Sequence, residues 1–362
     1  MVDAADSAHM ARALQLAARG RYGAHPNPMV GCVIVRDGVV VGEGWHEKAG
    51  EAHAEINALR IAGNAARGAT VYVSLEPCAH HGKTPPCADA LAEAGVGRVV
   101  AAMEDPFANV AGRGLQRLRE AGITVEVGLM QGAAESLNAG FISRVQRGRP
   151  RVRLKVAASL DGATAMNSGE SQWITGSAAR QDVHRLRASS GAVMTGIGTV
   201  LADDPSLNVR DVETPGRQPL RVVIDSRLRM SPEARMLELS GETLVCCTPG
   251  QDGTRLEQAG AQVQEFGAHG DGVNVFEVLA ALAEREINDV LVEAGPRLAG
   301  YLVEKELVDE LVIYIAPHIM GSETRGMFDT PHWLTLADRK VVDVIDLRRV
   351  GDDMRITARF GY

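Results

Sequence analysis

His53-Ala54-Glu55 and Pro77-Cys78-Ala79-His80-His81-Gly82-Lys83-Thr84-Pro85-Pro86-Cys87 are the two stretches that decide the fold of the first half of this chain. Together they supply a three-ligand set for zinc: His53, Cys78 and Cys87. Three protein ligands leave the fourth tetrahedral position open for water, which separates a catalytic zinc from a closed structural one. Zinc lowers the pKa of such a water toward neutrality, and Glu55 is placed to move protons beside it. We therefore predict a catalytic zinc site, with a structural zinc or ordinary core cysteines as the alternative.

The order of these residues resembles the signature of zinc nucleobase deaminases, which is His-x-Glu followed by Pro-Cys and a later cysteine. Hydrolytic deamination attacks a ring carbon that bears an amino group. It therefore needs a strong nucleophile at neutral pH and an acid that protonates the leaving ammonia, and zinc and Glu55 would supply them. One feature departs from the signature, because eight residues separate the two cysteines here instead of two.

The composition favours a soluble enzyme that acts on a small molecule. The chain has 362 residues, enough for two domains, and its 45% hydrophobic content can form a core in both. A net charge of -8 argues against a nucleic-acid partner, which normally requires a basic surface. The first residues carry no basic segment and no apolar run is long enough to span a membrane, so we expect no membrane partner and a cytoplasmic location. Five cysteines, an odd number, do not indicate a disulfide framework.

The first half alternates helical and strand patterns. Ser7 is a candidate cap for a first helix that stops at Gly20, and Asp37-Gly38 is the turn of a hairpin. His53 and Glu55 open a helix that runs to Gly63, and Cys78 follows a strand. The predicted strands are 30–35, 39–41, 70–75, 98–103 and 123–127, and further helices are predicted around 114–121 and 141–145. This pattern predicts a three-layer α/β domain over residues 1–147.

A short linker, Arg147-Gly148-Arg149-Pro150, precedes a second α/β pattern over residues 148–362. The predicted strands are 152–157, 192–196, 220–225, 243–247, 289–293 and 310–316, with a final pair within 344–360. The predicted helices are 177–188, 275–285 and 296–304.

Two glycine-bearing turns after strands are candidate anion sites in the second half. Gly295-Pro296-Arg297-Leu298-Ala299-Gly300 opens a helix, whose first amides and positive dipole end attract phosphate. The second turn, 196–207, carries two glycines and is followed by Arg210. Lys155 lies inside an apolar strand, a costly place for a charge without a partner or substrate. Taken alone, each turn is explained equally well by a plain strand-to-helix connection as by an anion site. Together, the two turns favour a phosphate-rich ligand such as a dinucleotide.

Both halves resemble one family, the bifunctional riboflavin-biosynthesis deaminase–reductases, and the resemblance runs along nearly the whole chain. The motifs that carry it in the first half are His25-Pro26-Asn27-Pro28 with Val30-Gly31, His53-Ala54-Glu55, and Glu76-Pro77-Cys78 through Cys87. In the second half they are Lys155-Val156-Ala157-Ala158-Ser159-Leu160-Asp161-Gly162, Ser168-Gly169-Glu170-Ser171-Gln172-Trp173-Ile174-Thr175, and Val292-Glu293-Ala294-Gly295-Pro296. The long spacer between the cysteines is a feature of this family.

The resemblance implies a cytidine-deaminase-like first domain with zinc and a dihydrofolate-reductase-like second domain with NADPH. Together they would deaminate a phosphorylated pyrimidine and then reduce its ribosyl side chain. By motif match, the substrate residues of the deaminase are Asn27, His46 and Lys83. Those of the reductase are Lys155, Ser171, Arg187, Leu207, Arg210 and Glu293. The cofactor residues are Ala157, Trp173, Thr199, Asp203, Ser226 and the run Gly295, Pro296, Arg297, Leu298, Ala299, Gly300 and Tyr301. We also expect a homo-oligomer, since proteins of these folds commonly associate.

Two other functions are consistent with parts of the sequence. A transfer-RNA adenosine deaminase shares the His-x-Glu and Pro-Cys elements, but it should be basic and have cysteines two residues apart. Alternatively, the second domain senses a nucleotide and regulates the deaminase without catalysis. Consumption of NADPH in the presence of deaminated substrate discriminates a reductase from a sensor.

Overall fold

The computed structural model describes residues 3–79, 86–107 and 111–361. The chain forms two compact units that divide after Gly148. No helix in these described ranges combines the length and apolarity needed to cross a membrane.

The first unit is built on a five-stranded sheet in the order β2-β1-β3-β4-β5. Its strands are β1 (Gly31–Arg36), β2 (Val39–Trp45), β3 (Thr70–Val73), β4 (Arg98–Ala101) and β5 (Thr124–Val127). Strand β1 is antiparallel to β2 and β3, as the predicted hairpin requires, and β3, β4 and β5 are parallel to one another.

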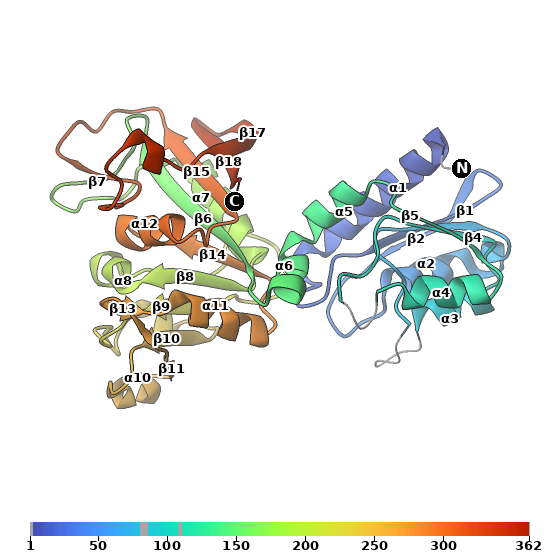
Figure 1. Ribbon diagram of the computed structural model, residues 1–362, viewed down its shortest axis with the longest axis horizontal. Helices are drawn as coiled ribbons and strands as arrows, with labels where there is room; N and C mark the ends of the chain where they lie inside the picture. The colour runs from blue at the N-terminus through green and yellow to red at the C-terminus, as the bar shows by residue number, and fades with distance from the viewer. Residues whose placement is uncertain (1–2, 80–85, 108–110, 362) are drawn as a thin grey trace. The chain divides into compact units, whose positions relative to one another are not determined.

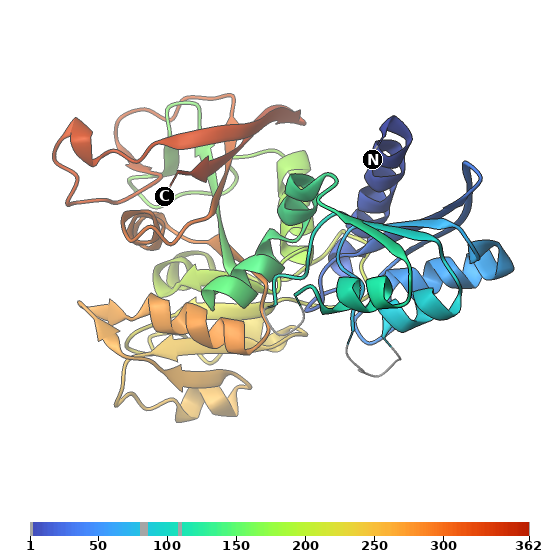
Figure 2. The same ribbon diagram turned by 45° about the vertical axis from the view of Figure 1, so that its right-hand side comes forward.

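Helices cover both faces of this sheet (Figures 1 and 2). They are α1 (Ala4–Ala17), α2 (Ala54–Ala62), α3 (Cys87–Glu93), α4 (Arg113–Glu120), α5 (Gln131–Leu137) and α6 (Ala139–Arg147), with 3-10 turns at Ala18–Tyr22 and Gly63–Ala66. Because side chains alternate along a strand, Val71 and Val99 face α2, α3 and α4, whereas Val33 and Val100 face α1 and α5. The three-layer α/β prediction is confirmed.

The start and end of the first helix differ from the prediction. Asp3, not Ser7, caps α1: its side chain accepts the backbone N–H of Asp6, and Asp6 accepts the backbone N–H of Asp3. This reciprocal pair stabilises a helix start four residues earlier than a serine cap at Ser7 would. The helix also ends before Gly20, which lies in a 3-10 turn, and a methyl group at Gly20 would lie 2.6 Å from the carbonyl oxygen of His46. This glycine is therefore required for close packing and does not end the α-helix.

The second unit contains a nine-stranded sheet in the order β11-β10-β9-β8-β14-β6-β15-β18-β17. Its strands are β6 (Arg151–Ser159), β8 (Ala192–Gly196), β9 (Leu220–Ile224), β10 (Thr243–Cys247), β11 (Gln262–Glu265), β14 (Asp289–Glu293), β15 (Glu310–Ala316), β17 (Val342–Val350) and β18 (Asp353–Phe360). Two small ladders pair β12 (Ala268–His269) with β13 (Gly272–Val273), and β7 (Ala163–Met166) with β16 (Thr324–Gly326). The strands from β11 to β15 in this order are parallel, and β18 and β17 are antiparallel additions.

Helices cover both faces of this sheet as well. They are α7 (Ser177–Ala188), α8 (Ile197–Asp203), α9 (Arg235–Glu238), α10 (Thr254–Gln258), α11 (Val275–Glu284) and α12 (Pro296–Glu304), with a 3-10 turn at Leu336–Asp338. Helices α11 and α12 contribute to one core, and α7, α8, α9 and α10 to the other. Adjacent parallel strands β8 and β14 are thus followed by helices on opposite faces. The carboxyl ends of such strands are where open α/β sheets bind ligands.

The sequence predicted a glycine-bearing turn over residues 196–207, but most of this segment is helical. Helix α8 begins immediately after β8, and Ile197 and Val200 are buried in the core beside α7. Apolar residues at helical spacing outweigh the cost of Gly198, whose added methyl group would have no neighbour within 4 Å.

Candidate active sites

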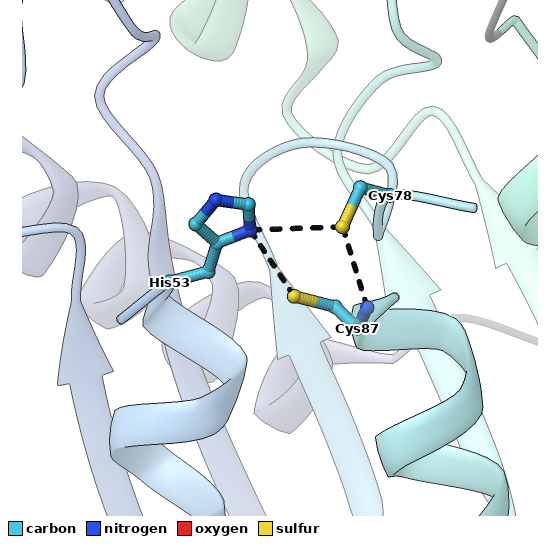
Figure 3. A group of neighbouring side chains, drawn as sticks. All are labelled: His53, Cys78 and Cys87. Carbon is cyan, nitrogen blue, oxygen red and sulfur yellow. Dashed lines mark hydrogen bonds between the residues drawn. The ribbon is translucent and has the colours of Figure 1, made fainter. Parts of the chain in front are cut away.

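The three predicted zinc ligands converge in the first unit (Figure 3). His53 is the cap residue of α2, Cys87 is the first residue of α3, and Cys78 follows β3. The Nδ1 atom of His53 lies 3.3 Å from Sγ of Cys87 and 3.6 Å from Sγ of Cys78. The backbone N–H of Cys87 donates to Sγ of Cys78 over 3.3 Å, so each of the three residues contacts the other two.

This geometry fits a zinc ion. Zinc lies about 2.3 Å from sulfur and about 2.0 Å from nitrogen, so tetrahedral ligation needs nitrogen–sulfur separations of about 3.5 Å. The observed separations of 3.3 and 3.6 Å are close to this value. Hydrogen bonds from Cys87 and from His53 lower the pKa of the Cys78 thiol, and a thiolate is the form that binds metal.

Glu55 lies beside the triad but is not part of the cluster that could hold a metal. It belongs to the first turn of α2, and its side chain is buried. Burial, together with the nearby charge of Cys78, raises the pKa of Glu55 to about 7. A carboxyl group of this kind can take a proton and return it at neutral pH.

Asn27 and His46 form one hydrogen-bonded pair in the first unit. Nδ2 of Asn27 lies 3.0 Å from Nε2 of His46, and Nδ1 of His46 lies 3.2 Å from the carbonyl oxygen of Ala52. Because the carbonyl can only accept, Nδ1 carries the proton and Nε2 accepts the amide N–H of Asn27. The ring of His46 also packs edge-on against His53, with centroids 5.4 Å apart. Both ring nitrogens of His46 are thus used within the protein. Lys83 lies outside the described residues.

The helix start predicted to bind the cofactor faces α8. The backbone N–H of Gly295 donates to Oγ1 of Thr199 over 3.1 Å, which joins the segments that follow β14 and β8. The cap residue Gly295 gives no side-chain hydrogen bond to the first-turn amides of α12, and Pro296 has no N–H to satisfy. The first-turn amides of α12 thus donate no hydrogen bond to a cap side chain, and this end of the helix, which follows β14, is suited to bind phosphate.

The rest of the run 295–301 divides between core and surface. Ala299 and Gly300 are buried, and a methyl group at Gly300 would lie 2.0 Å from the carbonyl oxygen of Asp329. The side chain of Leu298 lies against Gly196: a methyl group added at Gly196 would lie 3.6 Å from Cδ2 of Leu298. Arg297 is exposed, and the hydroxyl of Tyr301 lies 3.3 Å from Nδ1 of His269.

The other predicted cofactor residues, and the predicted substrate residue Ser171, make different contacts. Oγ of Ser171 donates to Oδ1 of Asp203 over 3.5 Å, and burial raises the pKa of Asp203. Oγ of Ser226 accepts the backbone N–H of Val273 over 3.1 Å. The Trp173 side chain is 66% exposed, with the guanidinium of Arg180 over its ring. Ala157 lies near the carboxyl end of β6.

A largely buried ion pair joins two predicted substrate residues. Nε and Nη2 of Arg187 donate to the two carboxylate oxygens of Glu293 at 2.5 and 3.0 Å, and Nη1 donates to the carbonyl oxygen of Asn208. Lys155 is directly opposite Glu293 in the sheet, and burial and the charge of Arg187 lower its pKa while Glu293 opposes the shift. Leu207 is buried at φ 46, and Nη1 of Arg210 donates to Oδ1 of Asn208.

Two residues near these sites were not identified from the sequence. His184, one turn before Arg187 on α7, is buried and accepts the backbone N–H of Arg210 over 3.4 Å. Burial and the charges of Arg187 and Arg210 lower its pKa to about 4. The sequence did contain one signal for His184: it lies three residues before Arg187, so the two side chains are neighbours on the surface of a helix. The second residue is Glu76, which is buried just before Cys78.

Two family models match the chain. The cytidine and deoxycytidylate deaminase zinc-binding region matches residues 3–103, and the RibD C-terminal domain matches residues 150–353.

Relatives and solved structures match over nearly the full length. The Escherichia coli riboflavin biosynthesis protein RibD is 51% identical over 360 residues, covering 96% of this chain and 98% of that protein. The structure of Acinetobacter baumannii RibD aligns with a TM-score of 0.91 at 45% identity, covering 99% of each chain. A deaminase/reductase structure from Thermotoga maritima aligns with a TM-score of 0.86 at 32% identity, covering 98% of each chain.

Proposed function

The chain belongs to the RibD family of riboflavin biosynthesis proteins, and we propose that its two units divide the reactions of one bifunctional enzyme. It is a zinc-dependent deaminase of diaminohydroxyphosphoribosylaminopyrimidine and an NADPH-dependent reductase of the product, 5-amino-6-(5-phosphoribosylamino)uracil. We assign deamination to residues 1–147 and reduction to residues 148–362. The convergence of His53, Cys78 and Cys87 beside a buried Glu55 is the observation that carries the assignment of the first site.

In the deaminase, we propose that Nδ1 of His53 and the thiolates of Cys78 and Cys87 hold the zinc ion. Bound zinc supplies a water whose pKa is near neutrality. The Glu55 carboxylate takes a proton from the attacking water and delivers it to the amino group that leaves as ammonia. Because Glu55 is buried, bulk water does not compete for this proton.

The proposed substrate contacts of the deaminase follow from the hydrogen bonds of His46. Since His46 accepts the amide N–H of Asn27, it fixes the direction in which the Asn27 carbonyl points. Asn27 then contacts the substrate directly, and His46 orients Asn27. Lys83 remains the candidate for the ribose phosphate because its ammonium is a compact charge suited to phosphate.

In the reductase, the open end of α12 and its surroundings are proposed to hold NADPH, which supplies the hydride. The residues are Ala157, Trp173, Thr199, Asp203, Ser226, Gly295, Pro296, Arg297, Leu298, Ala299, Gly300 and Tyr301. Ala299 and Gly300 are buried, so they contribute close packing of the helix. The proposed substrate residues are Lys155, Ser171, Arg187, Leu207, Arg210 and Glu293, with the Arg187–Glu293 pair fixing the orientation of both side chains.

A paired assay on the purified chain tests this function. Ammonia release from the diaminopyrimidine ribotide is measured without NADPH, and loss of NADPH absorbance is then followed after the cofactor is added. We expect both signals in that order. Ammonia without NADPH consumption would contradict the reductase assignment and leave a nucleotide sensor. NADPH consumption without ammonia would contradict the deaminase assignment.

An Arg187→Met variant in the same assay separates the two sites. Charge-assisted hydrogen bonds contribute about 1.5 to 3 kcal/mol, so we expect KM of the reduction step to rise about 10- to 100-fold. Ammonia release should not change. Arg185→Met is the matched control because Arg185 lies on the same helix with an exposed side chain. An unchanged KM in Arg187→Met would remove Arg187 from the substrate site.

We further propose that the enzyme forms a homo-oligomer through β17, the last strand of the nine-stranded sheet. Val344, Ile345 and Leu347 on this strand are all exposed, and exposed apolar edge strands favour pairing with another chain. Light scattering of the wild type should give a multiple of 38.5 kDa, and Leu347→Asp should shift the mass toward that of one chain. A monomeric wild type would contradict the proposal.

We also propose a cytoplasmic location, because the structure places none of the five cysteines in a disulfide; cell fractionation tests this proposal.

A further inference from the structure

The long spacer between Cys78 and Cys87 raises a structural question. Eight residues separate the two zinc ligands, and a longer loop costs more entropy to close than the two-residue spacer of other zinc deaminases. Nevertheless both sulfur atoms lie within 3.6 Å of Nδ1 of His53. Other parts of the unit must therefore hold the two cysteines in place, and helix α4 contacts the chain near each of them.

Glu76 joins the start of α4 to the chain two residues before Cys78. Its Oε2 accepts the backbone N–H groups of Asp105 and Gly112 at 3.1 and 2.9 Å. Its Oε1 accepts those of Gly114 and Leu115 at 2.8 and 3.4 Å. The cap residue of α4 is Gly112, which has no side chain to perform this role. Glu76 therefore caps α4 from a distant part of the chain, and its charge is favourable at the positive end of the helix.

Gly114 brings the first turn of α4 into direct contact with Pro77. A methyl group at Gly114 would lie 1.8 Å from the carbonyl oxygen of Pro77 and 3.2 Å from Oε1 of Glu76. Only glycine permits this approach. The backbone immediately before Cys78 is thus fixed against α4 by contact as well as by the Glu76 hydrogen bonds.

Arg117, one turn further along α4, links the two cysteine segments. Nη1 donates to the carbonyl oxygen of Ala79, the residue after Cys78, over 3.2 Å. Nε lies 2.5 Å from Oδ1 of Asp89, which is on α3 two residues after Cys87. One side chain therefore connects the Cys78 segment to the helix that begins with Cys87.

We propose that α4 is the support that fixes the distance between the two zinc cysteines, with Glu76, Gly114 and Arg117 as positioning residues. None of the three belongs to the cluster that could hold the metal. Residues that orient metal ligands affect metal affinity without touching the ion. The proposal rests on the zinc site proposed above and adds the side chains that pre-form it.

The test compares zinc affinity in Glu76→Gln, Arg117→Met and Arg119→Met variants of the full chain. Glutamine has the shape of glutamate but places an N–H donor against two backbone N–H donors. Arg119 is exposed on the same helix as Arg117, so its substitution is the matched control. Zinc affinity is measured by competition with a chelator, and ligand geometry by the absorption spectrum of the cobalt(II) form. NADPH oxidation with deaminated substrate checks that the chain is intact.

We expect Glu76→Gln to weaken zinc binding about 10- to 100-fold, as loss of outer support does in other metal sites. Arg117→Met should weaken it by a smaller factor, and both should alter the cobalt spectrum, whereas Arg119→Met should match the wild type. Glu76→Gln with wild-type zinc affinity and spectrum would overturn the proposal. If Glu76→Gln does not fold, Arg117→Met decides: zinc affinity equal to that of Arg119→Met overturns the proposal. A wild type that binds no zinc would instead contradict the proposed deaminase site.

Discussion

Serine in place of Cys78 is expected to abolish zinc binding and ammonia release while NADPH oxidation with deaminated substrate continues. Zinc prefers a thiolate, and hydrogen bonds already lower the pKa of Cys78 so that this form is available. A serine hydroxyl stays neutral at pH 7 and leaves two of the three ligands. Without the metal the attacking water keeps a pKa of about 15.7 instead of about 7, so deamination should fall below detection.

The measurement is zinc content by mass spectrometry after dialysis, together with both activities. Cys247→Ser is the matched control because Cys247 is a buried cysteine of the second unit, in β10. It tests whether replacing a buried thiol by a hydroxyl has general effects. Full zinc occupancy and normal ammonia release by Cys78→Ser would show that Cys78 is not a ligand.

Long segments with strong periodicity could be predicted from the sequence. The bounds predicted for α7 and α12, 177–188 and 296–304, are those found, and α2 begins just after His53 as expected. In each case the local pattern and the tertiary packing favour the same structure. The α/β fold class of both halves is confirmed for the same reason.

Short elements could not be predicted because their stability comes from distant contacts. Helix α3 follows two prolines, which indicate a break in the chain, and it persists because Ala88 and Leu91 pack in the core shared with α2 and α4. The ladder between β7 and β16 joins segments that lie far apart in sequence, and each strand has only three or four residues. Such strands carry little periodicity of their own.

The convergence of His53, Cys78 and Cys87 could be predicted because residue type alone limits the chemistry of these side chains. The roles of their neighbours depend on geometry that a sequence does not contain. The sequence predicted that His46 contacts substrate, and it does not show the hydrogen bonds of the two ring nitrogens to Asn27 and Ala52 on which the orienting role proposed above rests. Glu76 was visible only as part of a motif, because its four hydrogen-bond donors come from residues 105–115.

Glutamine in place of Glu55 is expected to leave zinc bound and to lower deaminase turnover by about 10²- to 10⁴-fold, the contribution of a positioned acid–base group. The amide has nearly the same shape, so the buried start of α2 should keep its packing. It cannot accept the proton of the attacking water or deliver one to the leaving ammonia.

Zinc content, ammonia release and NADPH oxidation distinguish the roles open to Glu55. The carboxylate lies outside the cluster that could hold the metal, so zinc content should equal that of the wild type, and NADPH oxidation should be unchanged. Glu47→Gln, an exposed position shortly before α2, is the control for loss of one negative charge. Loss of zinc from Glu55→Gln would make Glu55 a ligand or its direct support, and wild-type turnover would remove it from the proton transfer. Retained zinc with lost turnover is the only result that fits a residue that acts on protons beside the metal.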